Sequence, residues 1–334
     1  MPQGIKALRK ILLGYETSTG GSVAATAIWR GEGTIQDTRE VIHPVEDVGY
    51  LSGTTRTYTP SVGAEIEFSE TPATFEQIGY ILEAGVKMVT APTADGGGTD
   101  KIYPYTFPTT GSNSIRTYTI QGGDNIQQEQ MSYAFVTEFG LSGTSKQAVM
   151  MSAKWVGQQV SLGTFTTPVA LPTVETILFN NAKLYIDAIG GTIGTTLKSA
   201  TLLGFDLKAT TGYTPVFTGD GNLYFSFHKQ VMPEFVLTVT FEHDATSVAE
   251  KAAWRAETPR KLRLKIDGST VQTPGVIYSA KSLIIDAIGK WETFEKLDER
   301  DGNDIVTGTM RVRFDSTANS NGQIVVVNEL TALP

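Results

Sequence analysis

The chain of 334 residues carries a formal net charge of -8, is 40% hydrophobic and 19% charged, and contains no cysteine. Because domains usually hold roughly 100 to 200 residues, the length favours two domains, and the composition is typical of an ordered globular protein. The missing cysteines exclude disulfides and thiolate metal sites, and the acidic charge argues against a protein that grips nucleic acid through its phosphates.

The first fifteen residues contain an apolar run of only three residues, which is shorter than the roughly 7 to 15 of a secretory signal. No later segment has the character of a membrane span, so we expect a soluble protein that is made in the cytoplasm. Residues 4–13 are predicted to form a short arm that packs on a neighbouring molecule. Its apolar residues are Ile5, Leu8, Ile11 and Leu12.

The clearest helix signal of the first half follows a short alternating strand over residues 64–68. Thr71 is the predicted N-cap, Pro72 is the predicted first helical residue, and Gly85 lies just past the predicted end. The predicted apolar face of this helix consists of Phe75, Ile78, Ile81 and Leu82. A loop or protruding hairpin rich in Gly, Pro and Thr is expected over residues 90–114.

Two runs with a period of two follow over residues 130–141 and 148–158, and residues 141–146 between them are typical of a turn. We therefore predict a long antiparallel hairpin with one apolar and one polar side. The apolar side of the first run would hold Met131, Tyr133, Phe135, Phe139 and Leu141. The polar side of the hairpin would hold Gln130, Ser132, Glu138, Ser152, Lys154 and Gln158.

Residues 162–172 combine two prolines with little periodicity, which predicts a boundary between a first domain at 1–165 and a second at 166–334. The second half repeats the plan of the first. After a strand over residues 235–241, Asp244 caps a helix, and a second long hairpin follows. The polar side of the last strand of this hairpin would hold Thr307, Thr309, Arg311 and Arg313.

The two copies can be aligned on their apolar residues. Matching Phe68 to Phe241 and Val149 to Val306 gives offsets of 173 and 157. The first copy would therefore carry about 16 extra residues between helix and hairpin, where the glycine-rich loop lies.

The sequence contains no strong catalytic or metal-binding motif. His43, His228 and His243 lie far apart and lack partners at ligand spacing, so each is interpreted as a surface or turn residue. Residues 190–195 lack the Lys-Ser/Thr ending of a phosphate loop and are interpreted as a strand-joining loop. Asp298, Asp301 and Asp304 do not match the spacing of a calcium loop and favour a hairpin turn. We expect a non-enzyme without cofactor or metal.

Three segments together resemble the tail tube proteins of long-tailed bacteriophages. They are Thr-Pro-Ala-Thr-Phe-Glu-Gln-Ile-Gly-Tyr-Ile-Leu-Glu-Ala-Gly at 71–85, Tyr-Thr-Ile-Gln-Gly-Gly-Asp at 118–124 and Phe-Val-Thr-Glu-Phe-Gly-Leu-Ser-Gly at 135–143. The resemblance covers most of residues 1–160, and the second half looks like a diverged copy. It implies a mainly β chain of two tandem tail-tube-like β-sandwich domains, each with a flanking helix and a long hairpin that joins an inner β-barrel on oligomerisation.

The resemblance also implies partners and a location. Rings of the protein would stack into a tube around a tape measure protein, with tail terminator and baseplate proteins at its ends, as part of the virion tail. DNA would pass through the lumen during genome ejection without specific binding, and no membrane is involved. Because each half offers one hairpin, a ring of three chains would imitate a sixfold ring, so we expect trimers.

The polar side of each hairpin would then face the lumen. With a net charge of -8 we expect an acidic lumen in which isolated basic residues pair with neighbouring carboxylates. Contacts between rings are expected at the arm, at the loop over residues 91–114 and at the run over residues 324–327. The alternative is a β-rich binding or adhesin-like module of a virion or cell surface, in which Tyr and Trp residues line a ligand groove and the polar side is the outside of a monomer.

Overall fold

The computed structural model describes residues 3–333, and in these residues the protein is mainly β, with a large antiparallel sheet and two α-helices. The first half of the chain forms η1 (Lys6–Leu8), β1 (Lys10–Tyr15), β2 (Ala27–Ile28), β3 (Ile35–Asp37), β4 (Ala64–Pro72), α1 (Ile78–Gly85), β5 (Thr93–Ala94), β6 (Lys101–Thr106), β7 (Tyr118–Gly123), β8 (Gln128–Thr144), β9 (Met150–Gly157) and β10 (Val160–Gly163).

The second half continues after a connection over residues 164–175 that contains no helix or strand and includes the predicted domain boundary. It forms η2 (Phe179–Asn181), β11 (Ala182–Ala188), β12 (Leu197–Lys198), β13 (Leu202–Thr210), β14 (Tyr213–Val216), β15 (Phe227–Gln230), β16 (Glu234–Glu242), α2 (Ala245–Arg255), β17 (Arg260–Thr270), β18 (Ala280–Phe294), β19 (Asp298–Arg300), β20 (Asn303–Val312) and β21 (Gly322–Asn328). Neither α-helix is long and apolar enough to cross a membrane.

The strand pairings occur twice in the same order. In the first half β3 pairs with β4, β4 with β9, β9 with β8, β8 with β7, β7 with β1 and β1 with β2, while β10 also pairs with β8. In the second half β13, β16, β20, β18, β17, β11 and β12 pair in that order, while β21 also pairs with β18. The internal repeat that the sequence predicted is therefore present in the pairing itself.

A β-bulge marks the same position in both long hairpins. In β8 it lies between Val136 and Glu138, opposite Trp155 of β9, and in β18 it lies between Trp291 and Thr293, opposite Met310 of β20. A bulge adds one residue to one strand and bends it, so its recurrence fixes which residues are equivalent. Met310 follows Trp155 by 155 positions.

The predicted alignment of the two copies was wrong by two residues, although it gave the right difference in length. Ile66 pairs with Trp155 as Leu237 pairs with Met310, so Leu237 is the equivalent of Ile66 and follows it by 171 positions. The offsets are thus 171 and 155 instead of 173 and 157, and they still differ by 16. A shift of two residues keeps side chains on the same face of a strand, so alternation alone does not detect it.

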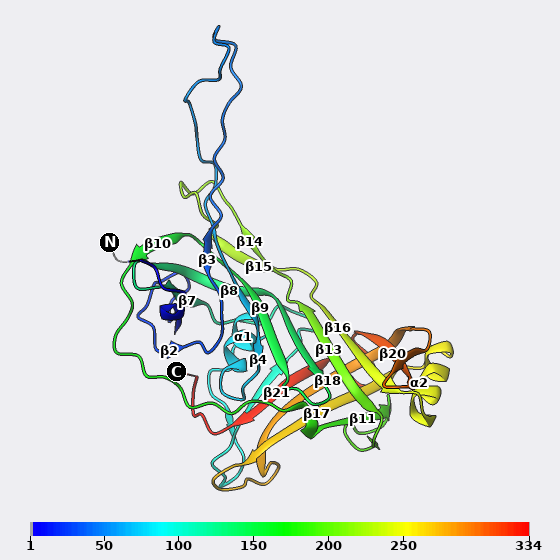
Figure 1. Cartoon of the computed structure of the whole chain (residues 1–334). Coiled ribbons are helices and arrows are strands. Elements are labelled where there is room, and N and C mark those ends of the chain that lie inside the picture. The colour runs from blue at the N-terminus through cyan, green and yellow to red at the C-terminus, as the bar shows by residue number, and fades with distance from the viewer. Residues whose placement is uncertain (1–2, 334) are drawn as a thin grey trace.

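The two halves are joined by direct strand pairing. β13 pairs with β8 from Thr210 opposite Glu138 to Gly204 opposite Thr144. One continuous sheet therefore runs in the order β3, β4, β9, β8, β13, β16, β20 and β18, and Figure 1 shows its central strands side by side. A single apolar core lies against it and includes residues of both halves, from Trp29 and Phe68 to Phe241 and Trp291.

The first helix begins later than the sequence predicted. Thr71 and Pro72 are the last residues of β4, where they pair with Met151 and Met150 of β9, so they do not cap the helix. The N-cap of α1 is Gln77, which makes no capping hydrogen bond with its side chain. Tertiary pairing with β9 outweighs the local preference of Thr-Pro for a helix start. The predicted cap of the second helix is confirmed, since Asp244 forms a capping box with Ser247.

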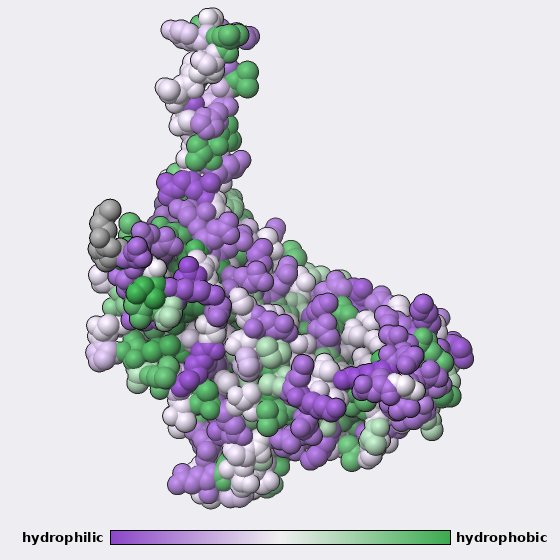
Figure 2. All heavy atoms as spheres, viewed as in Figure 1, coloured by the Kyte–Doolittle hydropathy of each residue, from purple (hydrophilic) through white to green (hydrophobic). Residues whose placement is uncertain are grey.

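An arm over residues 38–62 projects from the body between β3 and β4. It is the blue segment at the top of Figure 1, and Figure 2 shows hydrophobic side chains along it. Ile42 and Tyr58 bridge its two sides. Val45 and Leu51 are fully exposed at this arm, so these two side chains have no apolar partner within the described chain.

Candidate functional site

The continuous sheet has one apolar and one polar side, and we call the latter the polar face. Alternate residues of the strands point toward the core, as in β16, where Phe235, Leu237, Val239 and Phe241 are buried. The intervening residues form the polar face, which is the pattern of a sheet that packs on one side only. The polar face includes Gln36, Glu65, Glu67, Ser142, Ser152, Lys154, Glu138, Asp206, Lys208, Thr210, Thr238, Thr240, Thr307, Thr309 and Arg311.

Basic groups on the polar face are paired with carboxylates. Lys154 Nζ lies 3.4 Å from Glu65 Oε2, and Lys208 Nζ lies 3.4 Å from Asp206 Oδ2. Arg311 contacts Glu234 and also donates to Glu292, with Nε 3.1 Å from Oε2. The hydrogen bonds with Glu292 raise the pKa of the Arg311 guanidinium above its ordinary value. Exposed pairs contribute little to stability, but they remove free positive charge that would attract phosphates.

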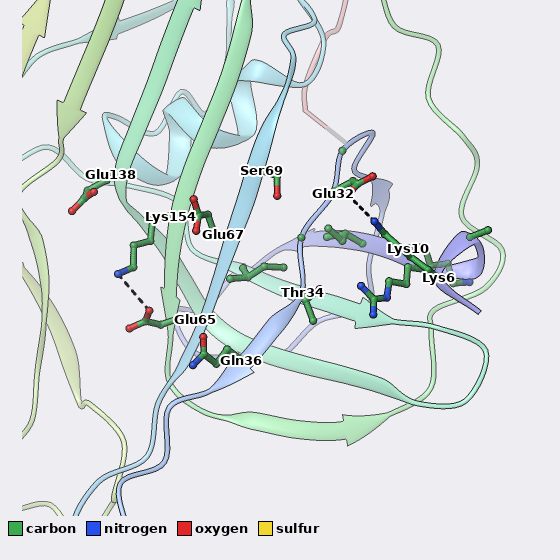
Figure 3. A pocket seen from close by; sticks show the side chains of 16 residues that line it. Lys6, Lys10, Glu32, Thr34, Gln36, Glu65, Glu67, Ser69, Glu138 and Lys154 are labelled. Atoms are coloured by element: carbon green, nitrogen blue, oxygen red, sulfur yellow. Dashed lines mark ion pairs between the residues drawn. The ribbon is translucent and has the colours of Figure 1, made fainter. Parts of the chain in front are cut away.

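A hollow of about 840 Å³ lies at the β3 end of the polar face. Figure 3 shows Glu138, Lys154, Glu65, Glu67 and Gln36 pointing into it from neighbouring strands, with the pair between Lys154 and Glu65 drawn as a dashed line. Carboxylates and basic groups line it in equal number, four of each, together with the Gln36 amide. The carboxylates are those of Glu32, Glu65, Glu67 and Glu138, and the basic residues are Lys6, Arg9, Lys10 and Lys154. The hollow is thus lined mainly by polar side chains and by charged side chains of both signs.

Most of the predicted lumen residues share the polar face. Glu138, Ser152 and Lys154 lie on it in the first hairpin, and Thr307, Thr309 and Arg311 lie on it in the second. Thr309 and Thr307 are within hydrogen-bond distance of Thr238 and Thr240 on β16, at 3.2 and 3.4 Å. Arg313 is exposed one residue beyond the end of β20. Whether this face lines a lumen stays a prediction.

Gln130, Ser132 and Gln158 do not share this face, so the prediction of one polar side for the whole hairpin was wrong. The segment of β8 that contains Gln130 pairs with β7 and β10 in a second sheet, where Gln130 donates to Ser22 Oγ at 2.5 Å. Gln158 lies just beyond β9 and donates to the Phe225 carbonyl at 3.0 Å. The first part of β8 belongs to the second sheet and the last part to the continuous sheet. Between these two parts its side chains change the side to which they point.

Two irregularities in the backbone of β8 explain why its side chains change sides. Tyr133 has a φ of +55°, and the bulge follows between Val136 and Glu138. Tyr133 and Phe135 therefore pack in a separate aromatic cluster with Tyr213 and Phe225, while Met131, Phe139 and Leu141 belong to the main core. The predicted single apolar side of this run was wrong because each extra residue reverses the alternation.

The arm that the sequence predicted over residues 4–13 is shorter than expected. Ile5 and Leu8 are about half exposed, in and beside η1. Ile11 and Leu12 are buried in β1, which lies between β7 and β2. These two residues were predicted as surface contacts, but hydrogen bonding on both edges makes them part of the sheet.

Of the two further predicted contact segments, one is internal in part and the other throughout. Within the loop over residues 91–114, Tyr103 and Tyr105 are buried in β6. Ile324 to Val327 are buried in β21, which pairs with β6 on one side and β18 on the other. The run over residues 324–327 is therefore internal, and the expectation that it bridges rings was wrong. The tips of the loop over residues 91–114 are exposed, so its contact between rings stays a prediction.

The remaining motifs have structural roles in the described residues. His228 packs among the rings of Tyr133, Phe135 and Tyr213, and burial lowers the pKa of its imidazole. Asp187 accepts hydrogen bonds from the backbone of Gly194, Thr195 and Thr196, which makes residues 190–195 a loop between β11 and β12. Desolvation opposes ionisation of Asp187, but these hydrogen bonds outweigh it and lower its pKa.

No potential metal-binding group of three or more His, Cys, Asp or Glu residues occurs within residues 3–333. Asp298, Asp301 and Asp304 lie in or beside the hairpin of β19 and β20, with Asp301 and Gly302 at positive φ in its turn.

Sequence reasoning missed the two ends of the continuous sheet. One end is β3, which pairs with β4 and, among residues 3–333, with no strand on its other side. The other end is the part of β18 beyond Gly289. β3 has only three residues, too few for a periodic signal, and its neighbours at 38–62 form the arm. No family model matches the chain, and no curated protein is significantly similar to it.

Proposed function

We propose that this protein is the structural subunit of a bacteriophage tail tube, which self-assembles into stacked rings that form the channel for genome delivery. The observation that carries the proposal is the continuous sheet across two repeats, with a packed apolar side and an ion-paired polar face. At each end of this sheet, one strand edge has no strand partner in the described part of the chain. Unpaired strand edges recruit further strands, and closing a sheet on itself removes them.

The proposed subunit contains two tandem tail-tube-like β-sandwich domains. In each half the long strand, β8 or β18, takes part both in the continuous sheet and in a second sheet with β7, β1 and β2 or with β17, β11 and β12. The long hairpins of several copies would together form the wall of an inner barrel. Since one chain supplies two hairpins, three chains supply six, and a trimeric ring is the proposed assembly.

The polar face would line the lumen. DNA can pass along a wall whose positive groups are neutralised, because phosphates gain no counterion release from paired Lys and Arg. The pairs at Lys154, Lys208 and Arg311 support this. The proposal includes a tape measure protein inside the tube, tail terminator and baseplate proteins at its ends, a place in the virion tail after assembly in the host cytoplasm, and no enzymatic activity, cofactor or membrane contact.

The alternative is a β-rich binding or adhesin-like module. The arm over residues 38–62 favours it, because exposed residues such as Tyr50 and Leu51 could contact another molecule. A groove lined by Trp residues is not supported, since Trp29, Trp155 and Trp291 are buried in the core.

Negative-stain electron microscopy of the purified protein tests the proposal. We expect rings or tubes, and native mass spectrometry of single rings should give three chains. A protein that stays monomeric across a wide concentration range, with or without nucleating tail components, would favour the binding module. Rings of six chains would leave the tail-tube function standing and reject the trimer.

A further inference from the structure

We propose that the part of β18 beyond Gly289 in one copy pairs antiparallel with β3 of a second copy, in the register that β8 and β13 use inside one chain. The inference rests on the proposed self-assembly and names the strands and residues that would carry it. It follows from the repeat, because a contact between the two halves of a chain is a template for the contact between one chain and the next.

The template is the internal joint between β8 and β13. There Ala209 lies opposite Phe139 and Leu207 opposite Leu141, and all four side chains are buried. Thr211 extends the joint, since its backbone N–H donates to the carbonyl of Thr137 at 2.9 Å. Thr137 is the bulge residue of β8. In the second half of the same chain, β13 thus pairs with this edge of β8.

Beyond Gly289, no strand of the described chain pairs with the equivalent edge of β18. β17 pairs with β18 only as far as Gly289, and β20 pairs with the other edge from Gly289 to Phe294. Glu292 is the bulge residue, equivalent to Thr137. Its carbonyl accepts a hydrogen bond from the Trp254 indole at 3.1 Å, and a carbonyl oxygen has a second lone pair for a backbone donor.

The matching edge of the partner is β3. Ile35 pairs with Ile66 of β4 as Leu207 pairs with Leu237 of β16, so β3 is the equivalent of β13. In β13 the opposite edge pairs with β8, whereas in β3 no strand among residues 3–333 occupies it. One copy therefore carries an unused β8-type edge and an unused β13-type edge at opposite ends of its sheet.

The register follows from the equivalences. Lys208 lies opposite Gly140 in the internal joint, and their equivalents are Gln36 and Glu295. Gln36 of one copy would therefore lie opposite Glu295 of the next. In the same register Arg39 would lie opposite Glu292, which places an exposed guanidinium against an exposed carboxylate.

One position departs from the template. Asp37 replaces Ala209 and would lie opposite Phe294, where the internal joint has Phe139. The Asp37 carboxylate lies 3.6 Å from Arg39, so it has a partner two residues further along its own chain. The contact between chains should for this reason be weaker than the contact within a chain.

The absence of cysteine allows a direct test by disulfide formation. In the internal joint Thr211 donates to Thr137 and Ser145 donates to Leu203, so the alternating pairs between them, including Lys208 with Gly140, are not hydrogen-bonded. Such pairs bring Cα atoms to about 4.5 Å, which suits a disulfide. Gln36 and Glu295 are both exposed, so Gln36→Cys with Glu295→Cys should not disturb folding.

We expect the double variant of the full chain, oxidised after assembly, to give covalent oligomers on a non-reducing gel that end at the size of the closed ring. Asp206→Cys with Ser142→Cys is the matched control, because the same type of pair lies inside one chain and should give a cross-linked monomer. Gln36→Cys with Lys290→Cys is off register by five residues and should give little cross-linking. Thr38→Cys with Thr293→Cys provides a second pair in the proposed register.

The outcomes separate the pairing from the function. Rings or tubes with no cross-link at either proposed pair, while the internal control cross-links, would overturn the pairing and leave the tail-tube function standing. A protein that neither assembles nor cross-links would contradict both the pairing and the tail-tube function. Covalent oligomers at Gln36→Cys with Lys290→Cys would show a different register and also overturn the proposal.

Discussion

The helices α1 and α2 follow the equivalent strands β4 and β16, yet one is buried and the other is largely exposed. All eight residues of α1 are buried, whereas only Ser247, Glu250 and Ala253 of α2 are. Gly79 of α1 lies against Leu333 and Tyr105, and Gly85 lies against Val136 and Thr211. The second half and the inserted strand β6 thus cover the first helix. The repeat determines where a helix lies, but its neighbours determine how much of it is covered.

The difference also appears in how each helix is stabilised. α1 has an apolar sequence and no capping side chain, so its stability comes from packing. α2 is polar on its outer side and has a capping box formed by Asp244 and Ser247. Each helix buries one carboxylate beside an arginine, Glu83 with Arg116 and Glu250 with Arg260. Each carboxylate also accepts from an aromatic side chain, Glu83 from the Tyr118 hydroxyl at 3.4 Å and Glu250 from the Trp291 indole at 2.9 Å. These contrasts can be tested one residue at a time.

The largest effect is expected from truncating a buried side chain of α1. Leu82→Ala removes a fully buried side chain and leaves a cavity, which should lower the free energy of unfolding by about 2 to 5 kcal/mol. Val248→Ala in α2 is the matched control, and because Val248 is 53% exposed it should change stability by less than about 0.5 kcal/mol. Chemical denaturation measures both, and similar losses would contradict the contrast.

A smaller, pH-dependent effect is expected at Glu83. Burial raises its pKa to about 7 against the opposing effect of Arg116, and one carboxylate oxygen lacks a partner. The folded protein therefore keeps the Glu83 proton up to about pH 7, whereas the unfolded chain loses it near pH 4.5. The stability that this proton contributes is fully present below pH 4.5 and is lost as the pH rises through about 7, by about 3 kcal/mol in total.

Glu83→Gln cannot titrate, so its free energy of unfolding should lack this decrease. The measurement is the difference between the two proteins from pH 4 to 8, in which contributions from other carboxylates, such as the lowered pKa of Asp187, cancel. A difference that does not change with pH would show that Arg116 keeps Glu83 ionised throughout.

The smallest effect is expected at the start of α2. Asp244→Ala removes the acceptor for the Ser247 backbone N–H, at 2.9 Å, and should cost about 1 kcal/mol. Asp244→Asn keeps an acceptor in the same place and should be nearly neutral. Thermal unfolding of the two variants provides the comparison, and equal losses would mean that charge, not the hydrogen bond, is what the cap supplies.

Local sequence patterns predicted those elements whose signal lies within a few residues. The cap at Asp244, the alternation in β16 and β20, and the order of strands and helix in each half are present in the structure. The polar face was predicted correctly where the strands are regular, as at Ser152, Lys154 and Thr309. Each of these depends on the period of two or on one capping hydrogen bond.

The failures lie where distant segments meet. Thr71 and Pro72 look like a helix start but pair with β9, and Ile11 and Leu12 look like an arm but form a strand between β7 and β2. Tyr133 and Phe135 face away from the main core because β8 changes sheets. In each case the partner is remote in sequence, so no local pattern contains it.

The β-rich class, the repeat and the length difference of 16 between its copies could be predicted from the amino-acid sequence alone, because periodicity, capping and turn composition are local properties. Three features depend on contacts between remote segments: the copies share one sheet through β8 and β13, bulges recur opposite Trp155 and Met310, and β3 and the end of β18 each have one edge without a strand partner among residues 3–333. Strand register and sheet edges arise from pairing between remote segments, and backbone hydrogen bonds carry no residue code that a single sequence reveals.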